Sequence, residues 1–256
     1  MPDNADMRRV AREGALLAGG ARAILLQIAH PGVGRGVVEH SDFAGRPLDR
    51  LRATLTYVYC VTFGTPEEIE AVAATVTAAH RKVAGAGYRA SDPELQLWVA
   101  ATLYDTALLV YGEVFGPLDA AVADRVYEQY AVLGTALQVP AELWPPDRSA
   151  FRVYWEHMID TLEVSDDARR VARDLLSPEH APLILKAAMP INRFLTAAWL
   201  PERIRGQYGI VWDDSQRRRY EQLMKLTRLA YRLLPAPLRE APKTYYLREM
   251  RRRLAG

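Results

Sequence analysis

The residue most suited to chemistry is His80, which stands where an aliphatic side chain would be expected on the buried face of a helix. It shares a stripe with Ile69, Ala73, Val76 and Val83, which recur every three or four residues. An inward imidazole among apolar walls is what an axial haem ligand requires, because haem iron takes few protein ligands. The alternative is a core histidine hydrogen-bonded to a backbone carbonyl, and spacing alone favours that alternative.

The preceding helix carries a second group of polar side chains. Arg50, Thr54, Tyr57 and Val61 are spaced by four, three and four residues, so they form one stripe. Arg50 and Thr54 lie one turn apart on the same face. A buried guanidinium is costly unless it is paired with an anion, and a haem propionate or a carboxylate would satisfy it. An arginine that reaches solvent or pairs with a glutamate fits the same spacing equally well.

Several common catalytic signatures are absent from the sequence. There is no Glu-x-x-His, His-Glu-x-x-His, Gly-x-Ser-x-Gly or P-loop pattern, which argues against di-iron bundles, zincins, α/β-hydrolases and P-loop proteins. The single cysteine, Cys60, excludes an intramolecular disulfide framework. Gly32, Gly34 and Gly36 follow a predicted helix rather than a strand, so they do not form a dinucleotide-binding loop.

Composition limits the classes of protein and partner. Half of the 256 residues are hydrophobic, which predicts a large core with room for a ligand cavity. A net charge of +2 gives no general attraction to nucleic acid. No apolar run is long enough for a membrane span and no signal peptide opens the chain, so we expect a cytoplasmic protein. The basic end (Arg248 and 251–253) is interpreted as a solvated helix face rather than a membrane or acidic-partner contact, and a homo-oligomer is left open.

In nearly every segment that must position these residues, apolar side chains recur with the spacing of a helix. We therefore predict an all-α fold over 1–256, as a single multi-helix domain with a buried haem pocket between helices. A helix from Val10 should stop at His30, before Pro31, and a glycine-rich connector should follow. Further helices are predicted near 47–64, 65–85, 91–116, 118–137, 147–161, 166–176, 181–199, 213–234 and 241–254, and the one near 91–116 is apolar nearly all round and should be central.

These residues, in this order, resemble the MpaB/latex-clearing-protein (rubber oxygenase) family, formerly a domain of unknown function, over about residues 12–235. The resemblance is carried by Ala29-His30-Pro31, His40-Ser41-Asp42-Phe43, Arg50-Leu51 with Thr54, Phe63-Gly64-Thr65, His80 with Val83 and Gly85, Asp92-Pro93, Trp98-Val99, Leu133-Gly134, Val139-Pro140, Leu200-Pro201, Arg205, Tyr208 and Gly209.

The resemblance implies an all-α fold that holds non-covalent haem b and uses dioxygen as co-substrate. The rubber-cleaving members break a carbon–carbon double bond of polyisoprene, and fungal members cleave a prenyl chain. The family's iron-ligating histidine matches His80, and its arginine and threonine near the haem match Arg50 and Thr54. The lysine that precedes the threonine in the rubber oxygenase is Ala53 here, so a lysine-ligated resting state is not expected. Glu39 does not align securely with the glutamate proposed as a base in those enzymes.

The function expected from this resemblance is a haem b-dependent oxygenase acting on a small apolar or alkene-containing molecule. In that reading His80 is the axial ligand, and Arg50 and Thr54 are both cofactor-binding and catalytic. The main alternative is a haem-binding or apolar-ligand-binding protein without turnover. A structural helical module and a non-haem metal enzyme are further alternatives, and the missing carboxylate–histidine spacing argues against the last.

Overall fold

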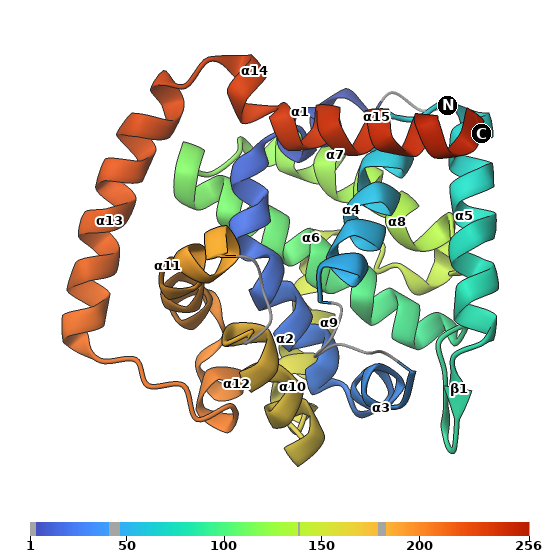
Figure 1. The fold of residues 1–256 in the computed structure, drawn as a ribbon, viewed down its shortest axis with the longest axis horizontal. Helices are drawn as coiled ribbons and strands as arrows, with labels where there is room; N and C mark the ends of the chain where they lie inside the picture. Colours follow the sequence, from blue (N-terminus) through green and yellow to red (C-terminus); the bar gives the residue numbers. More distant parts are fainter. Residues whose placement is uncertain (1–3, 41–46, 138, 179–182, 256) are drawn as a thin grey trace.

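The computed structural model describes residues 4–40, 47–137, 139–178 and 183–255, without the side chains of 47–50, 184 and 185. Within these ranges the chain is helical, apart from short connections and a hairpin of two-residue strands, which confirms the all-α prediction. The helices pack around α6 (Pro93–Phe115), which runs through the middle of the molecule (Figure 1).

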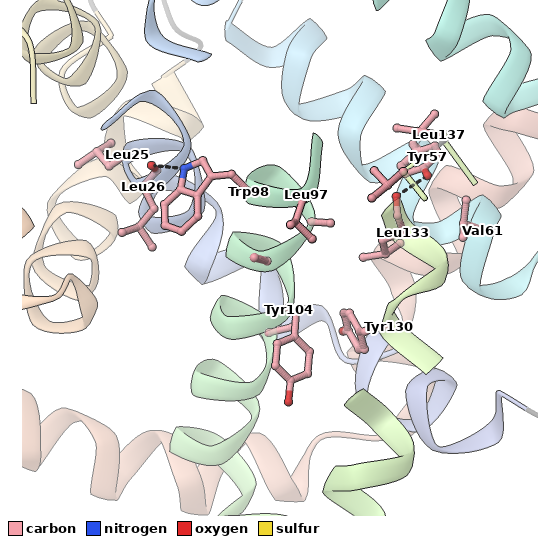
Figure 2. Close-up of a cluster of buried hydrophobic side chains, with 14 of the residues drawn as sticks. Leu25, Leu26, Tyr57, Val61, Leu97, Trp98, Tyr104, Tyr130, Leu133 and Leu137 are labelled. Carbon is pink, nitrogen blue, oxygen red and sulfur yellow. Dashed lines mark hydrogen bonds between the residues drawn. The ribbon is translucent and has the colours of Figure 1, made fainter. Parts of the chain in front are cut away.

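α6 is central because it is apolar on nearly every side. Asp92 caps its first turn by accepting a hydrogen bond from the Glu94 backbone N–H at 3.0 Å. Trp98 is fully buried in α6, and its indole N–H donates to the Leu26 carbonyl at 3.0 Å (Figure 2). The helix packs against the 3-10 helix η1 (Gly14–Gly19), α2 (Gly20–Ala29) and α13 (Asp214–Leu233). The predicted central position is confirmed.

An aromatic cluster fills the core on one side of α6. The ring of Tyr104 lies 4.9 Å from Phe151, 5.2 Å from Tyr127 and 5.4 Å from Tyr130, in edge-on arrangements. These contacts join α6 to α7 (Ala120–Tyr130) and α9 (Arg148–Thr161). They place the ring of Tyr130 between α6 and the neighbouring helices, close to the site described below (Figure 2).

The predicted continuous helix from Val10 to His30 is wrong in its first half. The chain forms α1 (Ala5–Ala11), then η1, then α2, with a break at Glu13, whose ψ of 117° is extended. Glu13 is 2% exposed and accepts from Arg239 at 2.8 Å. A Cβ on Gly14 would lie 2.7 Å from the Arg239 carbonyl oxygen. Contacts with a distant part of the chain therefore set this break.

The predicted glycine-rich connector is also wrong, because residues Pro31–His40 form the helix α3. The predicted stop at His30 is confirmed, since its ψ is 124°, but Pro31 then starts a new helix. The glycines of α3 allow close packing rather than a loop. A Cβ on Gly34 would lie 2.7 Å from the Ile28 carbonyl oxygen, and one on Gly32 would lie 3.0 Å from Leu95.

The next two helices agree with the predictions at their starts. α4 spans Pro47–Phe63, and α5 spans Pro66–Arg81 with the predicted capping box between Thr65 and Glu68. α5 ends before Gly85, because β1 (Ala84–Gly85) and β2 (Tyr88–Arg89) pair there as an antiparallel hairpin.

The remaining elements follow the predicted ranges closely. α15 (Ala241–Ala255) packs across α4 (Figure 1), so the end of the described chain returns to its first third. Three short helices were not predicted: η2 (Ala141–Leu143), α12 (Glu202–Gln207) and α14 (Ala236–Arg239). Three further helices lie within predicted ranges: α8 (Val132–Thr135), α10 (Asp166–Leu176) and α11 (Leu183–Trp199).

Within the described ranges, no single helix has the length and apolarity needed to cross a membrane. The segments Gly14–Ala29 and Pro31–His40 meet that criterion together by length and composition, but they are bent by 105°.

Candidate functional site

An apolar cavity lies between η1 and α2 on one side and α4, α6 and α8 on the other. The volume of the cavity that a water-sized molecule can reach is about 110 Å³. Small residues on η1 and α2 leave this room, and longer aliphatic side chains of α4 and α6 form the rest of the wall. The lining residues are Ala11, Leu16, Leu17, Gly19, Gly20, Ala23, Ile24, Gln27, Leu51, Thr54, Leu55, Val58, Tyr59, Leu103, Thr106, Ala107, Tyr130 and Leu133.

The polar groups in this wall are neutral amides, hydroxyls and phenols. Gln27 donates from its amide nitrogen to the Thr102 hydroxyl oxygen at 3.1 Å, which fixes the direction of the amide. Burial raises the pKa of Tyr59 and that of Tyr130 far above the ordinary value for a phenol. Both phenols therefore stay protonated. The described lining residues carry no charge, so an uncharged, mostly apolar molecule fits this cavity best.

A buried arginine holds the cavity wall to the central helix. Arg22 is 2% exposed and donates to the Thr106 hydroxyl at 2.6 Å, to the Asp105 carboxylate at 2.6 Å and to the Trp199 carbonyl at 2.8 Å. Burial raises the pKa of Asp105, and the neighbouring Arg22 opposes that rise. The pair fixes Thr106, which faces the cavity. In the sequence, Arg22 only interrupts an apolar stretch, and its place on the buried face of α2 was the signal that could have revealed it.

Thr54 lies in the cavity wall, half-buried on α4. Its predicted partner Arg50 belongs to α4 by its backbone, but its side chain lies outside the described residues. Residues 41–46, which lead into α4, also lie outside them. The structure therefore describes the surroundings of Thr54 and does not describe whether Arg50 points to the same place.

His80 lies in the last turn of α5, on the predicted inward stripe. Ile69, Ala73 and Val76 of that stripe are partly buried against the main core, and His80 itself is half-buried with its Nδ1 atom shielded from solvent. α4 and α5 pack against each other. His80 is nevertheless not among the residues that line the apolar cavity, so the structure does not bring it together with Thr54 in one described pocket.

His80 has the donor chemistry of a haem ligand, because an imidazole is a common axial ligand of haem iron. It shares its stripe of α5 with aliphatic side chains that pack against the core. In the ranges that the structure describes, no group of three or more His, Cys, Asp or Glu residues could hold a metal ion. A haem site requires one protein ligand to the iron rather than a group of three.

A polar cluster lies where α3 meets the hairpin that follows α5. Tyr88 donates from its hydroxyl to Glu39 at 2.5 Å, and the guanidinium of Arg35 lies over the Tyr88 ring at 5.8 Å. Burial, and then the hydrogen bond to Glu39, raise the pKa of Tyr88 to about 12. Glu39 is thus held by the hairpin and does not line the apolar cavity.

Comparison with known proteins identifies the family of this chain. The model of the family described as "ER-bound oxygenase mpaB/B'/Rubber oxygenase, catalytic domain" matches residues 7–229. Uncharacterized protein Mb2261 of Mycobacterium bovis and uncharacterized protein Rv2237 of Mycobacterium tuberculosis are each 40% identical over 225 residues, which cover 84% of this chain and 88% of each relative. No solved structure matches the chain. The chain belongs to the mpaB/rubber oxygenase catalytic domain family.

Proposed function

We propose that this protein is a haem b-dependent oxygenase that uses dioxygen to oxidise a small apolar or alkene-containing molecule. The observation that carries the proposal is the uncharged, mostly apolar cavity inside a chain of an oxygenase family. Apolar cavities with a few polar groups are the usual form of small-molecule sites. Thr54, which the resemblance assigns to the haem surroundings, is part of the cavity wall.

Each residue has a defined task in this proposal. His80 would hold the iron, and Arg50 would bind a carboxylate of the cofactor. Haem, when bound, supplies the redox chemistry that activates dioxygen. Thr54 orients its neighbours by hydrogen bonding. Aliphatic side chains exclude water from the cavity and lower the local dielectric constant. The contribution of the protein is thus positioning and electrostatics.

The first experiment measures haem binding. The purified protein is reconstituted with haem, and its visible spectrum is recorded together with that of His80→Ala. We expect a Soret band that is lost or strongly shifted in His80→Ala. His157→Ala is the matched control, because His157 is exposed on α9, and its spectrum should equal that of the parent. Absence of a Soret band in the reconstituted parent would refute haem dependence.

The second experiment separates turnover from simple binding. Oxygen uptake is measured with apolar alkenes of increasing length, for the parent and for Thr54→Val, which removes the hydroxyl but keeps the shape. We expect uptake in the parent, and reduced uptake with unchanged haem content in Thr54→Val. A protein that binds haem but consumes no oxygen with any alkene would instead support a binding protein without turnover.

A further inference from the structure

α13 is apolar on two opposite faces, and only one of them is covered. On the inner face, Met224 is 3% exposed and packs with Trp199 in a small second core. On the outer face, Leu226, Leu229 and Leu233 recur at i, i+3 and i+7, so they line up along the helix. Their exposed fractions are 68%, 66% and 76%. Burial in the fold therefore does not account for these three leucines.

The exposed leucines continue onto the next helix. Leu234 and Leu238, at the turn into α14 and within it, are 41% and 63% exposed. We call these five residues (Leu226, Leu229, Leu233, Leu234 and Leu238) the outer leucine surface. Single exposed leucines are common on proteins, but a contiguous group usually marks a contact with another molecule. The helix α13 stands at the edge of the molecule, where it forms the left border of the view (Figure 1).

The free charges beside the outer leucine surface are basic. Residues 222–239 contain no Asp or Glu, and of their four basic residues only Lys225 is free of partners among the residues that the structure describes. Arg228 pairs with Glu113, Arg239 pairs with Glu13, and Arg232 donates to the Phe115 carbonyl. Lys225 is exposed beside the leucines, and Arg218 and Arg219 are exposed two turns earlier on the same side of the helix. Within the described part of the chain, no ion pair engages these three cations.

A groove between α14 and α15 adds further basic side chains to this region. Pro237, next to Leu238, lines it together with Tyr245, Arg248 and Arg252, and its one acidic residue, Glu240, is paired with Lys243. Tyr245 is 51% exposed, and both arginines are exposed. Tyrosine and arginine side chains are enriched where a protein meets lipid headgroups, since each combines an apolar body with a polar end.

We propose that the outer leucine surface binds the anionic headgroup region of a lipid bilayer, with α13 lying flat on it. Helices that bind in this way combine an apolar stripe with flanking Lys and Arg and bury the stripe at the boundary between headgroups and acyl chains. Each basic residue near an anionic surface adds to the attraction. A helix at the edge of the molecule, with its leucines exposed along one face, can lie against a flat, deformable surface.

A second copy of the chain is the main competing occupant. Two outer leucine surfaces that faced each other would place Lys225 of both copies at the edge of one apolar contact. No acidic residue in 222–239 would be present to pair with them. Charge complementarity therefore favours an anionic lipid surface over self-association.

The test is co-sedimentation of the full chain with vesicles of phosphatidylcholine containing about 30% phosphatidylserine, compared with pure phosphatidylcholine. We expect binding to the anionic vesicles that weakens at high salt. Joint replacement of Leu226, Leu229 and Leu233 by Gln should lower the binding constant at least about tenfold, because each leucine loses its apolar burial. Arg218→Glu with Lys225→Glu should lower it by about tenfold or more through charge reversal.

Val153→Gln with Leu183→Gln is the matched control, since these aliphatic residues are 67% and 84% exposed outside the surface. This control should bind as the parent does, and circular dichroism should show unchanged helix content in every variant. Equal binding by the leucine variant and the parent would overturn the proposal. Absence of vesicle binding by the parent would also overturn it, and a dimer that the leucine variant converts to a monomer would then identify a second copy as the occupant.

Discussion

Gly19, where η1 packs on α6, allows a direct test of the packing around the cavity. A Cβ on Gly19 would lie 2.5 Å from Cγ2 of Thr106 and 2.9 Å from Cγ2 of Val110. Ordinary carbon contacts are about 3.5–4.0 Å, so the first contact falls short by roughly 1 Å. Both neighbours are β-branched residues in a helix, where χ1 has little freedom. In Gly19→Ala, η1 must therefore move away from α6.

We expect Gly19→Ala to lower the free energy of unfolding by about 1–3 kcal/mol, as overpacking of a core commonly does. The effect includes a disturbed hydrogen bond between Thr106 and Arg22, which is 2.6 Å long in the structure. For a chain of this size the midpoint of thermal unfolding should fall by roughly 2–12 °C. Circular dichroism during heating measures this shift directly.

Two other glycines serve as controls for the same substitution. A Cβ on Gly20 would meet only Leu51, at an ordinary 3.9 Å, and one on Gly112 would meet nothing within 4 Å. Both positions are helical, so alanine should leave stability unchanged or raise it by up to about 1 kcal/mol. If Gly19→Ala proved as stable as Gly20→Ala, the close packing of η1 on α6 would be refuted.

Three further predictions concern stability. Tyr57→Phe should lower the free energy of unfolding by about 1 kcal/mol in urea titrations, because the buried hydroxyl donates to the Leu133 carbonyl at 2.7 Å; no change would contradict this bond. The Arg251 guanidinium holds the pKa of Glu68 below its usual 4.5. The pair therefore stabilises the fold above pH 4.5, and this stabilisation disappears as the pH falls through the lowered pKa, because the carboxylate is then protonated. Glu68→Gln should therefore reduce the drop in melting temperature between about pH 6 and about pH 3, and an unchanged drop would count against the pair. Finally, we predict that the chain unfolds as one cooperative domain, so tryptophan fluorescence and far-ultraviolet dichroism should give coincident unfolding transitions. Separate transitions would show that it contains more than one folding unit.

The helix starts were predictable because their signals are local. The capping box at Thr65 and the cap at Asp92 depend on side chains that bind backbone N–H groups two or three residues away. The break at Glu13 and the helical state of α3 depend instead on Arg239 and on the close approach of Gly34 to Ile28. Such tertiary contacts leave no periodic signal in the sequence.

The candidate site was predictable only in part. Helical spacing predicted that His80 shares a stripe of α5 with residues that pack on the core, and Thr54 lies on the side of α4 that lines the apolar cavity. The phenols of Tyr59 and Tyr130 were not recognised as cavity residues, because they come from helices far apart in the sequence. Their shared position depends on how α4 and α7 pack around α6, which spacing within one helix cannot reveal. The role of His80 as an iron ligand stays a prediction.

The end of α6 has a consequence for synthesis on the ribosome. Its last carbonyl groups carry partial negative charge and have no partners within the helix. Arg228 donates to the Glu113 carbonyl at 2.5 Å, and Arg232 donates to the Phe115 carbonyl at 2.5 Å, from 115 and 117 residues further along the chain. A nascent chain that has completed α6 still lacks these guanidinium groups. The central helix therefore acquires its final partners only after α13 has been translated, and a product truncated before that point would leave both carbonyls to water.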